Sequence, residues 1–145
     1  MSDPRAANVE RWRAQLGAER LFILTAVTPF TVSQARFAVV DAAGGARLIS
    51  CRDCTPRSPL DIGESEPILP AVLRQFLDDL AAAADAWAED AVPANVHDGI
   101  TLTMERADAA GYARVRMVDP PPDSPHARLL AAWTRGFPAV RRALG

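Results

Sequence analysis

The stretch Glu66-Pro-Ile-Leu-Pro-Ala-Val-Leu-Arg-Gln-Phe-Leu-Asp-Asp-Leu-Ala-Ala-Ala-Ala-Asp-Ala-Trp87 has apolar residues at spacings of three and four, as in an amphipathic helix. The apolar stripe comprises Leu69, Val72, Leu73, Phe76, Leu77, Leu80, Ala84 and Trp87. Ser65 is suited to cap this helix, with Glu66 near the positive end of its dipole and Pro67 in the first turn. A stripe of this length must be buried, so the neighbouring segments are expected to pack against it.

Strand-like runs lie on both sides of the predicted helix. Before it, residues 21–28 are strongly apolar, and two further runs, 35–40 and 46–51, are separated by a turn at 41–45. These three runs predict an antiparallel meander, which an irregular proline-containing connection over residues 52–65 joins to the helix.

A second group of strands follows the helix. Apolar and polar residues alternate over 97–106, and residues 112–118 are expected to return as the partner strand of a hairpin. Short helices are expected at both ends of the chain. Their start and stop signals are Asp3-Pro4, Gly17, Ser124-Pro125 and Gly136.

The predicted element order is α-βββ-α-ββ-α, which belongs to the α+β class. We expect a single domain over residues 1–145, because this length suits one hydrophobic core and no linker divides the chain. Within that domain, an antiparallel sheet of about five strands is expected to carry its helices on one face.

The composition is that of a globular protein, with 49% apolar and 23% charged residues. No run of about 18 apolar residues and no signal-peptide core is present, so we expect a cytoplasmic protein without membrane contact. All sixteen basic residues are arginine. Residues 61–100 hold nine acids and one arginine, a balance of −8, which disfavours nucleic-acid binding and suits a basic protein partner.

Two surfaces are candidates for binding a partner. The polar side of the predicted helix carries Asp78 and Asp85, with Asp79 at its edge; the simpler interpretation is a solvated helix face. The outward face of the predicted hairpin combines tyrosine and arginine, residue types that are frequent at interface hot spots. This face presents Thr101, Thr103, Glu105, Tyr112, Arg114 and Arg116, and its simpler interpretation is a solvated face with Glu–Arg pairing.

The only short motif typical of metal or redox chemistry is Cys51-Arg-Asp-Cys54. Zinc would need further ligands, for which His97 or His126 could serve, but the motif has no second cysteine pair. A redox site would be expected to open a helix, whereas this motif follows a predicted strand. Two ordinary reduced thiols are therefore the preferred interpretation, and no metal or cofactor is expected.

The second half of the chain resembles a family of small bacterial α+β domains that has no established activity. In that family a strand begins with Asp-Gly, has an aromatic residue three positions later and ends in Glu; a Tyr-led return strand, a proline and a terminal helix follow. The matching positions here are Asp98-Gly99, Leu102, Glu105, Tyr112 and Pro120, with Leu102 in place of the usual Trp. The resemblance implies structural roles for these residues, with Leu102 in the core.

No catalytic motif stands out in the sequence. There is no Gly-x-Ser-x-Gly elbow or phosphate-cradling glycine loop, and Asp78-Asp79 diverge too far around a helix to act as a catalytic dyad. We therefore expect a non-catalytic protein-binding module, such as an immunity or inhibitor protein that caps a partner. The alternatives are a small-ligand-binding protein or enzyme with its site under loop 52–65, and a homo-oligomeric structural module.

Overall fold

The computed structural model describes residues 3–29, 34–93 and 99–144. Its elements are α1 Pro4–Gln15, β1 Ala18–Val27, β2 Gln34–Ala42, β3 Gly45–Cys54, β4 Glu64–Ile68, α2 Pro70–Ala82, the 3-10 helix η1 Ala84–Ala88, β5 Thr101–Asp108, β6 Gly111–Met117, α3 Pro125–Gly136 and α4 Pro138–Leu144. The predicted α+β class is confirmed, as are the start signals of the first and last helices. Among the described residues the sheet has six strands, one more than the predicted five.

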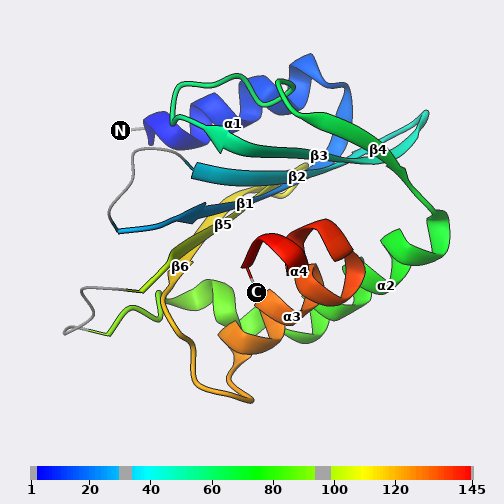
Figure 1. Cartoon of the computed structure of the whole chain (residues 1–145). Helices are drawn as coiled ribbons and strands as arrows, with labels where there is room; N and C mark the ends of the chain where they lie inside the picture. Colours follow the sequence, from blue (N-terminus) through cyan, green and yellow to red (C-terminus); the bar gives the residue numbers. More distant parts are fainter. Residues whose placement is uncertain (1–2, 30–33, 94–98, 145) are drawn as a thin grey trace.

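The strands lie in the order β4-β3-β2-β1-β5-β6, and each neighbouring pair is antiparallel. The predicted meander is therefore present as β1-β2-β3, and the predicted hairpin is present as β5-β6. The hairpin pairs with the other edge of β1, which makes β1 a central strand (Figure 1). In this register Thr25 of β1 lies opposite both Arg36 of β2 and Thr103 of β5, so three polar residues form one row across the sheet.

The predicted helix over residues 66–87 begins too early, and its last turns are the separate 3-10 helix η1 rather than a continuation of α2. Residues Glu64–Ile68 form the edge strand β4, and α2 starts at Pro70 with Leu69 as its N-cap rather than Ser65. The cause is Pro70, because a residue before proline is driven to extended backbone, and Leu69 has φ −63° and ψ 144°. Leu69 itself is 69% exposed and does not belong to the buried stripe.

Most of the hydrophobic core lies between the sheet and the helices α2, α3 and α4 (Figure 1). Phe76 of α2 is its centre: the ring makes edge-on contacts with Phe22 of β1, Trp133 of α3 and Phe137. Leu80 is also buried there, as the helical spacing predicts. The middle of the predicted stripe is thus confirmed as the element that covers this face of the sheet.

The expectation that the helices share one face of the sheet is wrong for α1. Val9 and Trp12 of α1 pack with Leu21, Ile23 and other residues that point to the opposite face, so this face has its own smaller core. Figure 1 shows α1 on the other side of the sheet from α2, α3 and α4. The strands are apolar on both sides, and a sheet with two apolar faces requires cover on each. The two-sided arrangement places α1 over the outward face of the predicted hairpin.

The described residues contain no helix that is long and apolar enough to cross a membrane. The predicted strand over 97–106 is observed as β5, Thr101–Asp108, which starts and ends later. His97 and Asp98 lie outside the described residues. Leu102 and Met104 of β5 are buried against the larger core, as their alternation predicts.

Candidate anion-binding pocket

A polar pocket of about 210 Å³ lies on the face of the sheet that α1 covers. It is built from the start of α1, from four strands of the sheet and from the segment that joins β3 to β4. Its lining comprises Arg5, Thr25, Val27, Gln34, Arg36, Pro56, Thr103, Glu105 and Arg114. Three of these residues are arginines and one is a glutamate, so the lining has a formal charge of +2 (three minus one).

The sheet register explains why these polar side chains converge. Thr25 pairs with Arg36 on one side and with Thr103 on the other, and Glu105 of β5 pairs with Arg114 of β6. Residues that face one another across antiparallel strands point to the same side of the sheet. Side chains from β1, β2, β5 and β6 therefore meet on the α1 face.

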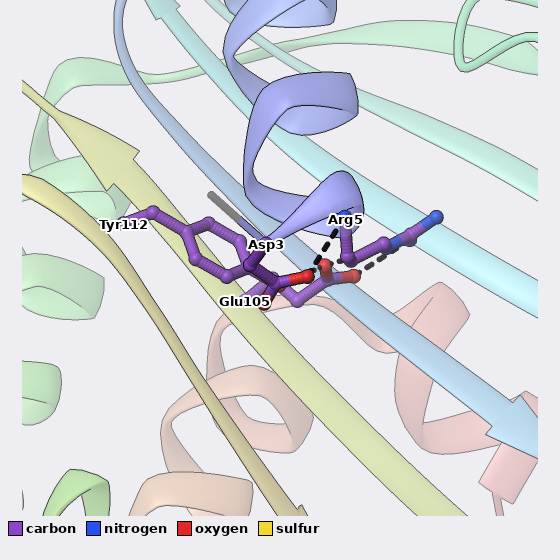
Figure 2. Close-up of polar contacts among 4 residues, drawn as sticks. All are labelled: Asp3, Arg5, Glu105 and Tyr112. Atoms are coloured by element: carbon purple, nitrogen blue, oxygen red, sulfur yellow. Dashed lines mark hydrogen bonds and ion pairs between the residues drawn. The ribbon is translucent and has the colours of Figure 1, made fainter. Parts of the chain in front are cut away.

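Glu105 is the anchor of one wall of the pocket. Its two carboxylate oxygens each accept a 2.7 Å hydrogen bond from the Arg5 guanidinium, and Oε2 also accepts one of 2.6 Å from the Tyr112 hydroxyl. Figure 2 shows the three side chains converging from α1, β5 and β6, with Asp3 capping α1 beside them. The carboxylate is only 1% exposed, so these bonds replace the water it has lost.

Two ionisation equilibria reflect this arrangement. The hydrogen bonds to Glu105 raise the pKa of Arg5 above its ordinary value, although burial acts in the opposite direction. Burial raises the pKa of Tyr112 well above its ordinary value, and the bond to the Glu105 carboxylate raises it further. Arg5 is therefore charged and Tyr112 neutral at physiological pH, so both side chains can donate their hydrogen bonds to Glu105.

Arg36 forms the opposite wall and is only 3% exposed. Its Nη2 donates hydrogen bonds to the carbonyl oxygens of Ser58, at 2.9 Å, and Pro59, at 2.7 Å. Its guanidinium carbon also lies 5.5 Å from the centroid of the Trp12 ring. Backbone carbonyls carry only partial charges, and Arg36 forms no ion pair with any described residue, so its charge is available to attract an anion in the pocket.

The hydroxyl of Thr25 has no hydrogen-bond partner among the described residues, although Thr25 is only 8% exposed. An unpartnered buried hydroxyl costs about 1–3 kcal/mol, so such groups are rare in folded proteins. Thr25 lies next to Arg36 in the register and lines the same pocket. A bound polar ligand would satisfy it.

The chemistry of the lining favours the binding of an anion. Guanidinium groups present several donors in a planar fork that matches carboxylate and phosphate oxygens. Glu105 already accepts bonds from Arg5 and Tyr112, which leaves Arg36, Arg114 and the Thr25 hydroxyl to face a ligand. A hydroxyl next to the Arg36 cation can complete the coordination of an oxyanion.

The structure brings together the charged and aromatic residues of the hairpin face that the sequence singled out. Glu105, Tyr112, Arg114 and Arg116 share one face of β5 and β6, as predicted. The prediction that this face is solvent-facing is wrong for Glu105, because α1 covers it and Arg5 neutralises the carboxylate. Arg116 is exposed, lies outside the pocket lining, and pairs with Asp90 at 3.4 Å.

The three predicted acidic residues lie elsewhere. Asp78 and Asp79 are on α2 and Asp85 is on η1, and these elements cover the opposite face of the sheet from α1 (Figure 1). Asp78 and Asp85 are exposed, whereas Asp79 is half-buried and accepts a 2.8 Å hydrogen bond from Gln75. The acidic surface and the hairpin face therefore do not form one continuous interface.

Both cysteines are free and lie on β3 rather than at the start of a helix. Burial raises the pKa of the Cys54 thiol, although the charge of Arg36 acts in the opposite direction, and this thiol lies 3.4 Å from the Gln34 carbonyl oxygen. His126, a predicted zinc ligand, is on α3 and lies 2.7 Å from the Glu89 carbonyl oxygen. The described part of the chain holds no group of three or more potential metal ligands.

The residues that the sequence reasoning missed are those far from the hairpin. The sequence analysis does not single out Arg5, Thr25 or Arg36. It does offer a ligand site under loop 52–65 as an alternative, and Pro56 of that loop lines the pocket. A signal for two of them exists in the sequence: Thr25 and Arg36 are polar residues inside otherwise apolar strand runs. Buried polar positions of this kind often mark functional sites.

No protein-family model and no curated protein matches this sequence. The resemblance to a family of small bacterial domains therefore stays a prediction. Of its residues, Leu102 lies in the core, as expected. Glu105 and Tyr112 are joined by a hydrogen bond, which agrees with the structural roles that the resemblance implies.

Proposed function

We propose that this protein is a non-catalytic binding protein that holds an acidic group of a small ligand in the arginine-lined pocket. The observation that carries the proposal is the Thr25 hydroxyl, which has no hydrogen-bond partner among the described residues and is buried beside Arg36 in a pocket with a charge of +2. Pro56, Ser58 and Pro59 belong to the loop that the sequence suggested as a cover for a ligand site.

The expected affinity follows from the number of contacts. A hydrogen bond to a charged group contributes about 1.5–3 kcal/mol, and Arg36, Arg114 and Thr25 can together supply about three such bonds. A total of about 6 kcal/mol corresponds to a dissociation constant between about 1 mM and 1 μM. Both carboxylate and phosphate groups fit this chemistry.

Titration calorimetry with inorganic phosphate and with succinate tests the proposal. Arg114→Ser removes an exposed cation from the pocket, whereas Arg116→Ser removes one of equal charge from the same strand outside it. We expect the first substitution to weaken binding about tenfold or more and the second to change it less than about twofold. Equal effects of both substitutions, or no binding of either probe, would contradict the proposal.

A second candidate function is the capping of a basic protein partner, as in a bacterial cytoplasmic immunity protein. It is favoured by Asp78 and Asp85, which are both exposed and make no ion pair with another described residue. Reversing both charges with Asp78→Arg and Asp85→Arg should slow association with such a partner and remove its salt dependence. Unaltered association kinetics would mean that this acidic surface does not bind the partner.

Homo-oligomerisation by strand addition is the least supported of the three functions. At one edge, β4 contains Pro67 and exposed Glu64 and Glu66, which oppose pairing with another chain. At the other edge, the backbone of Ala91 is hydrogen-bonded to Arg116 and Val118. Size-exclusion chromatography with light scattering should therefore report a monomer.

A further inference from the structure

We infer that the ligand carries two acidic groups, and that a second basic pocket on the other side of Pro56 receives the second one. This inference rests on the proposed function, because it needs the first acidic group to occupy the pocket of Arg36 and Arg114. It adds the class of the ligand: an elongated molecule with an acid at each end.

The second pocket has a volume of about 470 Å³ and lies between α1 and the segment after β3. Its lining comprises Asn8, Arg11, Trp12, Gln15, Pro56, Arg57 and Pro59. The four residues from α1 are spaced as one stripe along a helix, and the other three come from the loop that also contacts Arg36. The pocket is thus a groove between a helix and a proline-rich loop.

The two pockets adjoin one another. Pro56 lines both of them. Trp12 lines the second pocket, and its ring lies 5.1 Å from the guanidinium carbon of Arg5 and 5.5 Å from that of Arg36, which line the first. Pro56 is therefore a common wall of the two pockets, and a ligand that occupies both must pass over it.

The second pocket is also positive. Arg11 and Arg57 contribute two cations, and its lining contains no carboxylate. Both are exposed, and within the described residues neither forms an ion pair; Arg11 donates a hydrogen bond to the neutral side chain of Asn8. Clustered cations repel one another, so an anion at this position is favoured by charge.

The spacer between the two acids is expected to be apolar or flat. Proline and tryptophan rings form the surface that it crosses, and such rings pack against hydrocarbon or aromatic groups. Once the first acid is bound, the second contact is intramolecular and costs little further translational freedom. A ligand with two acidic groups should therefore bind at least about tenfold more tightly than an analogue with only one acidic group.

The test is a calorimetric series of unbranched dicarboxylic acids, from succinate to dodecanedioate, each compared with the monocarboxylic acid of the same length. The wild-type protein is compared with Arg57→Ser, which alters the second pocket, and with Arg114→Ser, which alters the first. Arg52→Ser is the matched control, because Arg52 is an exposed arginine near the same loop that lines neither pocket.

We expect the dicarboxylate affinity to pass through a maximum at one chain length, about tenfold above the matching monocarboxylate. Arg57→Ser should abolish that maximum and leave monocarboxylate binding unchanged, while Arg52→Ser should alter neither. Equal binding of mono- and dicarboxylates at every length, with Arg114→Ser still weakening both, would overturn the inference and leave the proposed function standing. A lack of binding by any acid would overturn both.

Discussion

Arg5 of α1 donates two 2.7 Å hydrogen bonds to Glu105 of β5, a residue one hundred positions later in the chain. The pair joins the first helix to the hairpin that completes the sheet, and Tyr112 adds a third bond from the next strand. Because Glu105 is almost fully buried, each partner needs the other to compensate for lost hydration. This connection sets the distance between α1 and the strands that line the anion pocket.

The first prediction concerns Glu105→Gln, which keeps the shape of the side chain and removes its charge. The amide cannot accept both bonds from Arg5, so we expect the free energy of unfolding to fall by about 2–3 kcal/mol in chemical denaturation. Glu10→Gln is the control, since Glu10 pairs with Arg13 at the surface of α1 and should contribute less than about 0.5 kcal/mol. Similar losses in both variants would mean that Glu105 is not the anchor described here.

The second prediction uses the fact that Tyr112 is the only tyrosine in the chain. Burial and the Glu105 carboxylate favour the neutral phenol, so the pKa of Tyr112 in the folded protein lies above the ordinary value of about 10. Ultraviolet absorbance should show tyrosinate forming at higher pH in the native protein than in urea. Identical midpoints in the two states would show that the phenol is not bonded to Glu105.

The raised pKa of Tyr112 also predicts how the free energy of unfolding depends on pH. A group whose pKa is raised on folding contributes its full stabilisation below the unfolded pKa of about 10, and this stabilisation is lost as the pH rises towards the folded pKa. Stability should therefore fall above about pH 10. The slope that belongs to Tyr112 should disappear in Tyr112→Phe.

The third prediction separates function from stability at Thr25. The Thr25 hydroxyl has no partner in the described part of the chain, so replacing it by a methyl group in Thr25→Val removes a desolvation cost and should make the free protein more stable by about 1 kcal/mol. Phosphate binding should weaken in the same variant. Thr101→Val on β5, outside the pocket lining, should change stability by less than about 0.5 kcal/mol and leave binding unaltered. A Thr25→Val protein that is destabilised yet binds normally would contradict the proposed role.

The fourth prediction compares two residues of the helical stretch. Phe76→Ala should cost about 3–5 kcal/mol, because the ring is 1% exposed and contacts three other aromatic rings. Leu69→Ala should cost less than about 0.5 kcal/mol, because Leu69 is exposed before the helix begins. Comparable losses on urea denaturation would restore Leu69 to the buried stripe and contradict the observed helix start.

Five of the six strands in the described residues were predictable from the sequence, because each buries a face and therefore shows an apolar run or an alternation. The sixth, β4, was missed: four of its five residues are exposed, and Pro67 interrupts any pattern. It is a strand because its backbone pairs with β3, for example Ser65 with Ile49. Such backbone pairing does not depend on the side chains of β4 and leaves no signal in their pattern.

The candidate pocket could be predicted only in part. The hairpin alternation placed Glu105, Tyr112 and Arg114 on one face, and this is confirmed. The cover over that face could not be predicted, since α1 reaches it through contacts between residues about one hundred positions apart. The role of Arg36 depends on the same long-range assembly, because its partners Ser58 and Pro59 come from a loop without a repeating pattern.

The most direct test of the central claim is a heteronuclear NMR titration of the protein with inorganic phosphate. If the pocket holds the anion, the signals of Thr25, Arg36 and Arg114 should shift together and saturate with one dissociation constant. The exposed arginines Arg116, Arg141 and Arg142 should show no saturable change, since they lie outside the pocket. Shifts spread without saturation over all exposed arginines, or an unmoved Thr25 signal, would contradict the claim.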